Sequence, residues 1–264
     1  VYDYNYYNSK YSDLKSAFKG DDIDLLVHFV NNGMKEGRQA SKKFNVQIYK
    51  NNYTDLQQAF GNDLKPYYMH YIQNGKAEGR IAESQIYHSV ITKSTTTVNQ
   101  MVNYYNAKAS YPAYYGNANV PDIRSFCQIY YDEATAEGVD PALAFTQAMK
   151  ETGFLKFTGQ VKIEQFNFAG MGVTGAGTNG DSYQNVREGI RAHVQHLKAY
   201  AVKNPAFANQ VVDKRYSPWF AANRSGTAPY IEWLGISENP SGFGWAAEKG
   251  YGYSILNDYM NQLY

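Results

Sequence analysis

The segment "DPALAFTQAMKETGFLKF", residues 140–157, places one acid, Glu151, beside a cluster of phenylalanines. The dipole of a helix disfavours an anion at its C-terminal end. Apolar rings that exclude water act in the same direction, and both effects raise the pKa of a carboxyl group. A carboxyl group that stays protonated near neutral pH is what a general acid requires. The alternative is a solvated acid at a helix end, paired with Lys150 or Lys156.

A second segment that could contribute to a binding or catalytic site is "QFNFAGMGVTGAGTNGDSY", residues 165–183, which contains five glycines. This composition favours a tight, irregular strand and turn that approaches a ligand closely. The segment lacks the GxxxxGK[ST] pattern of a phosphate loop. Asn167 carries a donor and an acceptor on one side chain, as recognition of an N-acetyl group needs.

Other reactive side chains favour structural interpretations. Cys127 falls within an apolar helical pattern, which is typical of a buried thiol. His193 and His196 are three residues apart on one helix, but a metal pair needs further ligands and no HExxH motif is present. His28 and His70 lie on apolar faces, where a packed histidine is more common than a ligand. We therefore expect no metal and no cofactor.

The sequence predicts helices that position Glu151 and the segments around it. Asp140 followed by Pro141 predicts a helix start, and Gly153 predicts its end. The spacing then puts four residues on one face of that helix: Ala144, Gln147, Ala148 and Glu151. Residues 122–138 and 186–201 also show the apolar period of a helix.

The first third of the chain is an internal repeat. An offset of 42 residues aligns 7–40 with 49–82 and gives 14 identities without a gap. The pattern of each copy predicts short helices. In the first copy, the second helix is expected to carry Leu25, Leu26, Phe29 and Val30 and to end at Gly33. The shared Glu-Gly-Arg triplets favour solvated ion pairs at a helix exit. The predicted organisation is two helical repeats over 1–84, a linker over 85–97 and one domain over 98–264.

Composition limits the classes of function. The formal net charge is +1 and there is no basic block, so we expect no nucleic-acid partner. No long apolar run is present, so we expect no membrane span. The 26 tyrosines suit half-buried packing and stacking on sugar rings, and the single cysteine excludes an internal disulfide. The chain starts without an initiator Met or an apolar leader region, so we expect either that a leader has been removed or that the sequence has been shortened at this end.

Five collinear blocks resemble the glucosaminidases of glycoside hydrolase family 73, in its short clostridial autolysin branch. They are "EGVDPALAFTQAMKETGFLKF", "QFNFAGMG", "GIRAHVQHLKAYA", "GTAPYIEWLGISENPSGFGWA" and "YGYSIL". The resemblance implies a mostly helical, lysozyme-like α+β fold with a small β or loop lobe. It also implies a secreted cell-wall or cell-surface monomer that cuts peptidoglycan strands between N-acetylglucosamine and N-acetylmuramic acid. The repeats resemble a unit of clostridial surface proteins, which suggests anchoring or spacing.

The resemblance assigns the general acid to Glu151 and a substrate contact to Asn167. The block matches extend the expected substrate contacts to Gln147, Phe168, Tyr230, Trp245, Tyr251 and Tyr253. Two departures stand out. A second acid has no secure equivalent, with Asp181 as the nearest candidate and Glu164 and Glu188 as others. Trp245 stands where the family often has a tyrosine, so the phenol role passes to Tyr251 or Tyr253.

Glycoside hydrolysis needs a proton for the leaving oxygen and stabilisation of a positive sugar carbon. Glu151 supplies the proton, while the second task falls to the substrate's own 2-acetamido group or to a water held by Asp181. Two alternatives remain. One is a lytic transglycosylase of the same fold, and the other is a wall-binding protein without activity.

Overall fold

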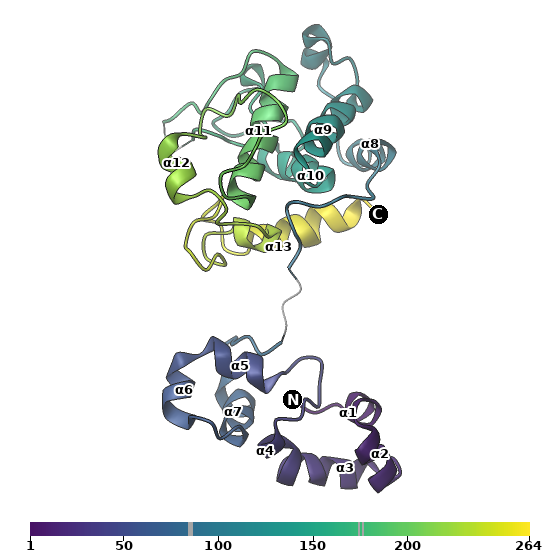
Figure 1. Cartoon of the computed structure of the whole chain (residues 1–264). Helices are drawn as coiled ribbons and strands as arrows, with labels where there is room; N and C mark the ends of the chain where they lie inside the picture. Colours follow the sequence, from purple (N-terminus) through teal and green to yellow (C-terminus); the bar gives the residue numbers. More distant parts are fainter. Residues whose placement is uncertain (84–86, 174, 176) are drawn as a thin grey trace. The chain divides into compact units, whose positions relative to one another are not determined.

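The computed structural model describes residues 1–83, 87–173, 175 and 177–264. The chain divides into two compact units, Val1–Ile86 and Tyr87–Tyr264, each with its own hydrophobic core (Figure 1). The segment expected as a linker, 85–97, begins outside the described residues. From Tyr87 onward it belongs to the second unit: the His88 ring lies 2.7 Å from a Glu232 carboxylate oxygen. The backbone of Val90 also donates to the carbonyl of Pro229.

Two copies of one helical pattern form the first unit. The first copy consists of α1 (Tyr4–Lys10), α2 (Ser12–Phe18), α3 (Asp22–His28), a π-helical turn (Phe29–Gly33) and α4 (Met34–Glu36). The second consists of α5 (Val46–Asn52), α6 (Thr54–Phe60), α7 (Lys65–His70) and a π-helical turn (Tyr71–Gly75). The order of elements therefore repeats along with the sequence.

The repeat histidines are half-buried and hydrogen-bonded, as predicted. His28 Nδ1 lies 3.2 Å from the Tyr7 hydroxyl, and His70 Nδ1 lies 2.9 Å from the Tyr49 hydroxyl. A Cβ atom on Gly33 would come within 2.6 Å of the Tyr7 hydroxyl oxygen. The glycine therefore makes room for the buried phenol.

Gly33 was predicted to end a helix, and that prediction is wrong. The helical backbone runs through it into α4, and the left-handed residue that ends the helix is Gly37, with φ of 72°. The predicted apolar face is also narrower than expected. Leu25 and Phe29 are buried, whereas Leu26 and Val30 are 42% and 39% exposed.

The Glu-Gly-Arg triplets form surface ion pairs, as predicted. Arg38 bonds to Glu36 and Asp13, and Arg80 makes the same two contacts with Glu78 and Asp55. Such exposed pairs contribute little to stability.

The second unit is built on helices that pack around α9. Its helices are α8 (Val98–Asn106), α9 (Ile123–Glu137), α10 (Pro141–Thr152), α11 (Val186–Ala201), α12 (Pro218–Asn223) and α13 (Tyr251–Ser254). Short 3₁₀ turns cover Ala113–Ala118, Ile163–Gln165 and Ile231–Leu234. α9 packs against α8, α10 and α11.

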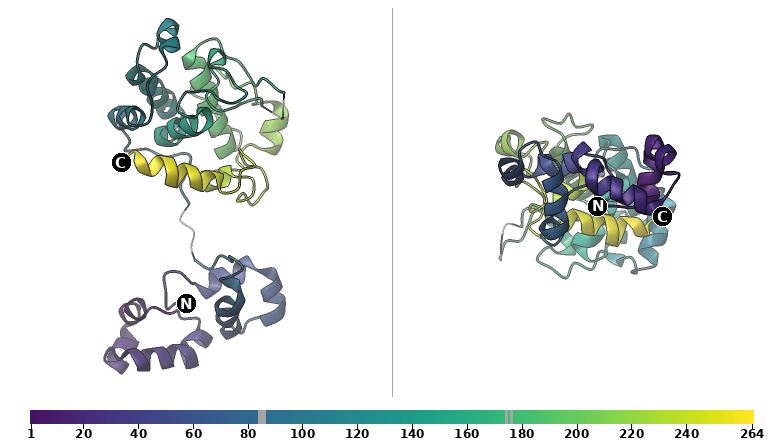
Figure 2. Two further views of the ribbon diagram at one scale, coloured as in Figure 1. Left: turned by 180° about the vertical axis from the view of Figure 1, so that it is seen from behind. Right: turned by 90° about the horizontal axis from the view of Figure 1, so that it is seen from below.

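The C-terminal segment closes the second unit. After α13 it continues through a π-helical turn (Ile255–Tyr259) and a 3₁₀ turn (Met260–Gln262) as one helical rod (Figure 2). This rod packs against α10. The mostly helical fold is confirmed. Pairing in the described part of the chain is limited to isolated β-bridges, so the small lobe takes the loop form.

α10 begins and ends as the sequence predicts. The Asp140 carboxylate accepts a hydrogen bond of 2.8 Å from the backbone of Ala142, and Gly153 adopts φ of 58° at the other end. Small residues along its length let neighbouring helices approach closely: Ala142, Ala144 and Ala148, all fully buried.

Ion pairs fix α11 against α9. Glu133 is 2% exposed and receives hydrogen bonds from Arg187 and Arg191, which hold the pKa of its carboxyl group below the usual range despite its burial. Lys198 bonds to Glu137 at 2.7 Å, one turn further along α9 and two turns further along α11. Cys127 is buried in the core of the second unit, as predicted, and burial raises its pKa. Among the described residues, no helix has the length and apolar character needed to cross a bilayer.

Candidate active site

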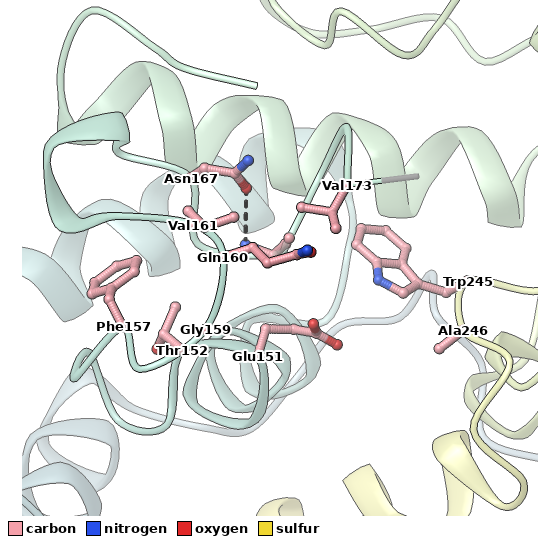
Figure 3. A pocket seen from close by; sticks show the side chains of 12 residues that line it. Glu151, Thr152, Phe157, Gly159, Gln160, Val161, Asn167, Val173, Trp245 and Ala246 are labelled. Carbon is pink, nitrogen blue, oxygen red and sulfur yellow. Dashed lines mark hydrogen bonds between the residues drawn. The ribbon is translucent and has the colours of Figure 1, made fainter. Parts of the chain in front are cut away.

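A cleft of about 330 Å³ opens where α10 ends, between the glycine-rich segment and the loop that carries Trp245. Figure 3 shows the carboxyl group of Glu151 pointing into it, with the Trp245 ring on the facing side. Its lining consists of Glu151, Thr152, Phe157, Gly159, Gln160, Val161, Asn167, Ala169, Gly170, Val173, Trp245 and Ala246. The structure therefore brings three predicted site residues together, namely Glu151, Asn167 and Trp245.

The Glu151 side chain is exposed by its accessible surface, which opens onto the cleft. Protein atoms packed near the carboxyl group nevertheless limit its hydration. Burial raises its pKa above the usual value, and the hydrogen bond from Tyr251 and the charge of Lys150 oppose this only in part. The direction is the one that a general acid needs.

The backbone after α10 is strained in a way that shapes the cleft. Phe154, Leu155 and Phe157 have φ of 59°, 62° and 50°, a left-handed region that costs a side-chain-bearing residue about 1 kcal/mol or more. The Thr152 hydroxyl accepts a hydrogen bond of 2.9 Å from the backbone of Leu155, and the Leu155 side chain is buried. Packing thus holds a turn that sequence rules do not predict.

A chain of buried polar side chains ends at Glu151. The Tyr130 hydroxyl lies 3.1 Å from His193 Nδ1, and His193 Nε2 lies 3.0 Å from Gln147 Oε1. Gln147 Nε2 donates to the Tyr251 hydroxyl at 2.9 Å, and this hydroxyl donates to Glu151 Oε1. The chain connects α9, α11, α10 and α13 through the core.

The direction of each hydrogen bond in this chain follows from its members. Gln147 Oε1 can only accept, so His193 carries its hydrogen on Nε2 and accepts at Nδ1 from Tyr130. Burial lowers the pKa of His193 to about 3, so its ring is neutral and has one N–H. Tyr251 receives a hydrogen from Gln147 and gives its own to Glu151. A protonated Glu151 therefore carries its proton on Oε2, which faces Gly170.

Lys150 and Glu248 form a charged pair beside the acid. Lys150 Nζ lies 3.1 Å from a Glu248 carboxylate oxygen, so the lysine pairs with Glu248 and not with Glu151. The Glu248 charge raises the pKa of Glu151 and the Lys150 charge lowers it. Sequence reasoning missed Glu248, although its place three residues after Trp245 was a usable signal.

Asn167 and Phe168 anchor the glycine-rich segment, the first by hydrogen bonds and the second by packing in the core. Asn167 Nδ2 donates to the carbonyls of Met171 and Asp181, and Oδ1 accepts from the backbone of Ala169 and Met171. The amide is fully used, so it cannot serve an N-acetyl group in this conformation. Phe168 is fully buried, with its ring 5.1 Å from that of Phe126. Both residues position the segment, Asn167 also lines the cleft, and their contact with substrate stays a prediction.

Gln147 is likewise internal, since it is fully buried within the hydrogen-bonded chain. Tyr230 stacks on Tyr87 with ring centroids 5.0 Å apart and is not part of the cleft lining. Tyr253 is 37% exposed on the rod that starts at α13, outside that lining. Of the two tyrosines considered for the phenol role, Tyr251 is the one bonded to Glu151.

The candidates for a second acid lie outside the cleft lining. The Asp181 carboxyl group packs against Gly172, where a Cβ atom would come within 2.8 Å of Asp181 Cγ. Glu188 caps the start of α11 through the backbone of Gln184, and Glu164 is exposed on the Ile163–Gln165 turn. Glu151 is thus the one carboxyl group among the described residues that line the cleft.

A helical domain with one protonable carboxyl group in a cleft beside a half-buried aromatic ring has the parts of a glycoside hydrolase. A family profile described as mannosyl-glycoprotein endo-beta-N-acetylglucosaminidase matches residues 127–264, just over half of the chain. The chain belongs to this glucosaminidase family, as the sequence blocks predicted.

One relative is an uncharacterized protein of Borreliella burgdorferi, 43% identical over 109 residues. The match covers 41% of this chain and 51% of that protein, so it spans about half of the relative's length. No solved structure matches the chain.

Proposed function

We propose that the second unit hydrolyses the β-1,4 bond between N-acetylglucosamine and N-acetylmuramic acid in peptidoglycan, with Glu151 as general acid. The observation that carries this proposal is the state of the Glu151 carboxyl group. Burial raises its pKa, Tyr251 occupies Oε1, and Oε2 faces Gly170 in the cleft lining. Family membership supports a glycan substrate.

In the proposed reaction, Glu151 Oε2 gives its proton to the glycosidic oxygen as the bond from that oxygen to the sugar carbon breaks. Positive charge then develops on the carbon, and the carbonyl oxygen of the 2-acetamido group on the same sugar attacks it. Water opens the resulting ring, and Glu151 takes one proton from that water. Such substrate assistance is a known exception to the two-carboxylate scheme. The absence of a second acid from the described cleft lining favours this route over a water held by Asp181.

Trp245 supports sugar binding in this scheme. Its ring packs on His193 and His196 at 5.6 Å and 5.0 Å between centroids, so its orientation is fixed before substrate arrives. A rigid indole beside the acid offers an apolar face to a sugar ring. Because peptidoglycan lies outside the membrane, we also propose that the protein acts at the cell wall or cell surface.

Mass spectrometry of digested peptidoglycan tests the proposed reaction. We expect fragments whose reducing end is N-acetylglucosamine, with one oxygen from water labelled in H₂¹⁸O. Fragments that end in anhydromuramic acid and contain no label would instead identify a lytic transglycosylase. Intact glycan strands after prolonged incubation would identify a binding protein without activity.

A further inference from the structure

The cleft continues past Trp245 into a second, smaller hollow of about 100 Å³. The two hollows share Ala169, Gly170, Val173 and Trp245. The smaller one is lined by two cationic side chains, Arg215 and Arg224, which also border a third, outer hollow of about 300 Å³. The acid therefore lies at one end of a continuous depression and the two arginines lie at the other.

Among the described residues, neither arginine has an anionic partner. In the part of the chain that the structure describes, no carboxylate forms an ion pair with either guanidinium group. The nearby Asp213 is already committed, since Oδ2 lies 2.8 Å from His196 Nδ1 and Oδ1 accepts from the backbone of Arg215. Arg224 Nε is buried and has no hydrogen-bond partner. A buried donor of this kind costs free energy until a ligand pairs with it.

The surroundings hold Arg224 in place for a ligand. Its guanidinium lies 5.4 Å from the centroids of both the Trp219 and Phe243 rings, and Nη1 reaches the Tyr200 hydroxyl at 3.5 Å. Trp219 is 59% exposed, so the outer hollow combines positive charge with an open aromatic face. A planar guanidinium with free N–H groups matches a carboxylate, which it can bind through two parallel hydrogen bonds.

We propose that Arg215 and Arg224 form a carboxylate-binding subsite that recognises the acidic substituent of the glycan while Glu151 acts on the neighbouring bond. This inference rests on the proposed function. The muramic acid residue carries a lactyl ether, which ends in a carboxylate itself or in a peptide that bears carboxylates. N-acetylglucosamine carries no such group, so the subsite distinguishes the two alternating sugars and fixes which bond reaches Glu151.

The test compares soluble peptidoglycan strands with the same strands after their carboxylates have been converted to methylamides. For the wild-type protein we expect amidation to lower kcat/KM about tenfold, mainly through KM, because a charge-assisted pair to a buried donor is lost. Arg215→Gln and Arg224→Gln should show a similar loss on native strands and little further loss on amidated ones. Arg124→Gln, which removes an exposed charge on α9 away from these hollows, should behave as wild type.

Equal KM values of the wild-type protein for native and amidated strands would overturn the subsite, whether or not the arginine variants fold. Cleavage of neither substrate would contradict the proposed function instead. Strands freed of their peptides separate the two carboxylate sources. If the arginine variants keep their defect there, the subsite binds the lactyl carboxylate, and if the defect disappears, it binds the peptide.

Discussion

At the scale of single residues, the site depends on how one carboxyl group is oriented and how its pKa is raised. Tyr251 donates a hydrogen bond to Glu151 Oε1, Gln147 donates to the Tyr251 hydroxyl, and His193 bonds to Gln147. The acid therefore differs from a helix-end glutamate in water both in its pKa and in which oxygen carries the proton. Sequence reasoning reached the first property through the neighbouring phenylalanines. It did not reach the second, because the partners come from helices far apart in the chain.

Replacing Tyr251 with Phe tests the orientation of the acid. The hydrogen bond from Tyr251 lowers the pKa of Glu151, so its loss raises that pKa further and keeps the acid protonated to higher pH. We expect the alkaline limb of the pH–rate profile to move to higher pH and kcat to fall about tenfold, as one positioning hydrogen bond is lost. Tyr253→Phe is the comparison and should leave the limb in place. An unmoved limb in Tyr251→Phe would show that the phenol does not act on Glu151.

His193 gives a prediction about stability in acid. Its pKa falls from 6.5 to about 3 on folding, so the unfolded chain binds a proton in this window that the folded protein does not. The free energy of unfolding therefore falls as pH drops below 6.5, with a slope from this residue of about 1.4 kcal/mol per pH unit. Urea unfolding from pH 7 to pH 4 should give a shallower dependence for His193→Gln than for wild type. Parallel curves for the two proteins would mean that His193 is not buried as a neutral ring.

At the scale of elements, α10 was the most predictable part of the site and the loops around it were the least. The cap at Asp140, the stop at Gly153 and the small-residue face all follow local rules, and the structure confirms them. The left-handed turn at Phe154 and Leu155 does not, because tertiary packing there outweighs a local backbone preference. Asn167 illustrates the same limit, since its residue type fits substrate recognition but its actual partners are backbone groups of its own segment.

The contact between α11 and the start of the glycine-rich segment should be sensitive to a single methyl group. A Cβ atom on Gly189 would lie 1.8 Å from the carbonyl oxygen of Phe166, which immediately precedes Asn167. Gly189→Ala should therefore lower the free energy of unfolding by about 1–3 kcal/mol, although alanine is the better helix former. It should also lower activity by displacing the segment that lines the cleft.

Gly116→Ala is the matched control, because a Cβ atom there meets nothing within 4 Å. Thermal unfolding and rates on soluble strands should be close to wild type for this variant. An equally mild effect of Gly189→Ala would contradict the tight contact between α11 and Phe166.

At the scale of the whole molecule, each unit has its own core. All described residues that line the cleft belong to the second unit. The 42-residue offset predicted the repeated helices because contacts within one copy recur in the other, such as that between Tyr7 and His28 and that between Tyr49 and His70. The start of the second unit was harder to predict, since residues after Tyr87 look like a polar connector in sequence. Their partners, Glu232 and Pro229, lie far along the chain. Anchoring by the repeats stays a prediction.

Two truncated chains test this division. A chain that begins at Tyr87 should cleave soluble strands at a rate within about twofold of the full chain, because the core of the second unit is intact. A chain that begins at Val98 loses His88 and leaves the buried carboxylate of Glu232 without that partner. Its free energy of unfolding, measured in urea, should be about 1–3 kcal/mol lower than that of the chain that begins at Tyr87. Equal stability of the two shorter chains would show that residues 87–97 act only as a connector.

The central claim is that the proton for bond cleavage comes from Glu151. Its most direct test is the rate at which reducing-end N-acetylglucosamine appears on peptidoglycan strands, measured for wild type and Glu151→Gln. The amide keeps the size of the side chain and still accepts from Tyr251, but it cannot give a proton. The account predicts that this rate falls at least about a hundredfold in Glu151→Gln, as is typical when a general acid is removed. The free energy of unfolding of the variant at pH 7 should be no lower than that of wild type. Release of the sugar at near wild-type rate by a folded Glu151→Gln protein would contradict it.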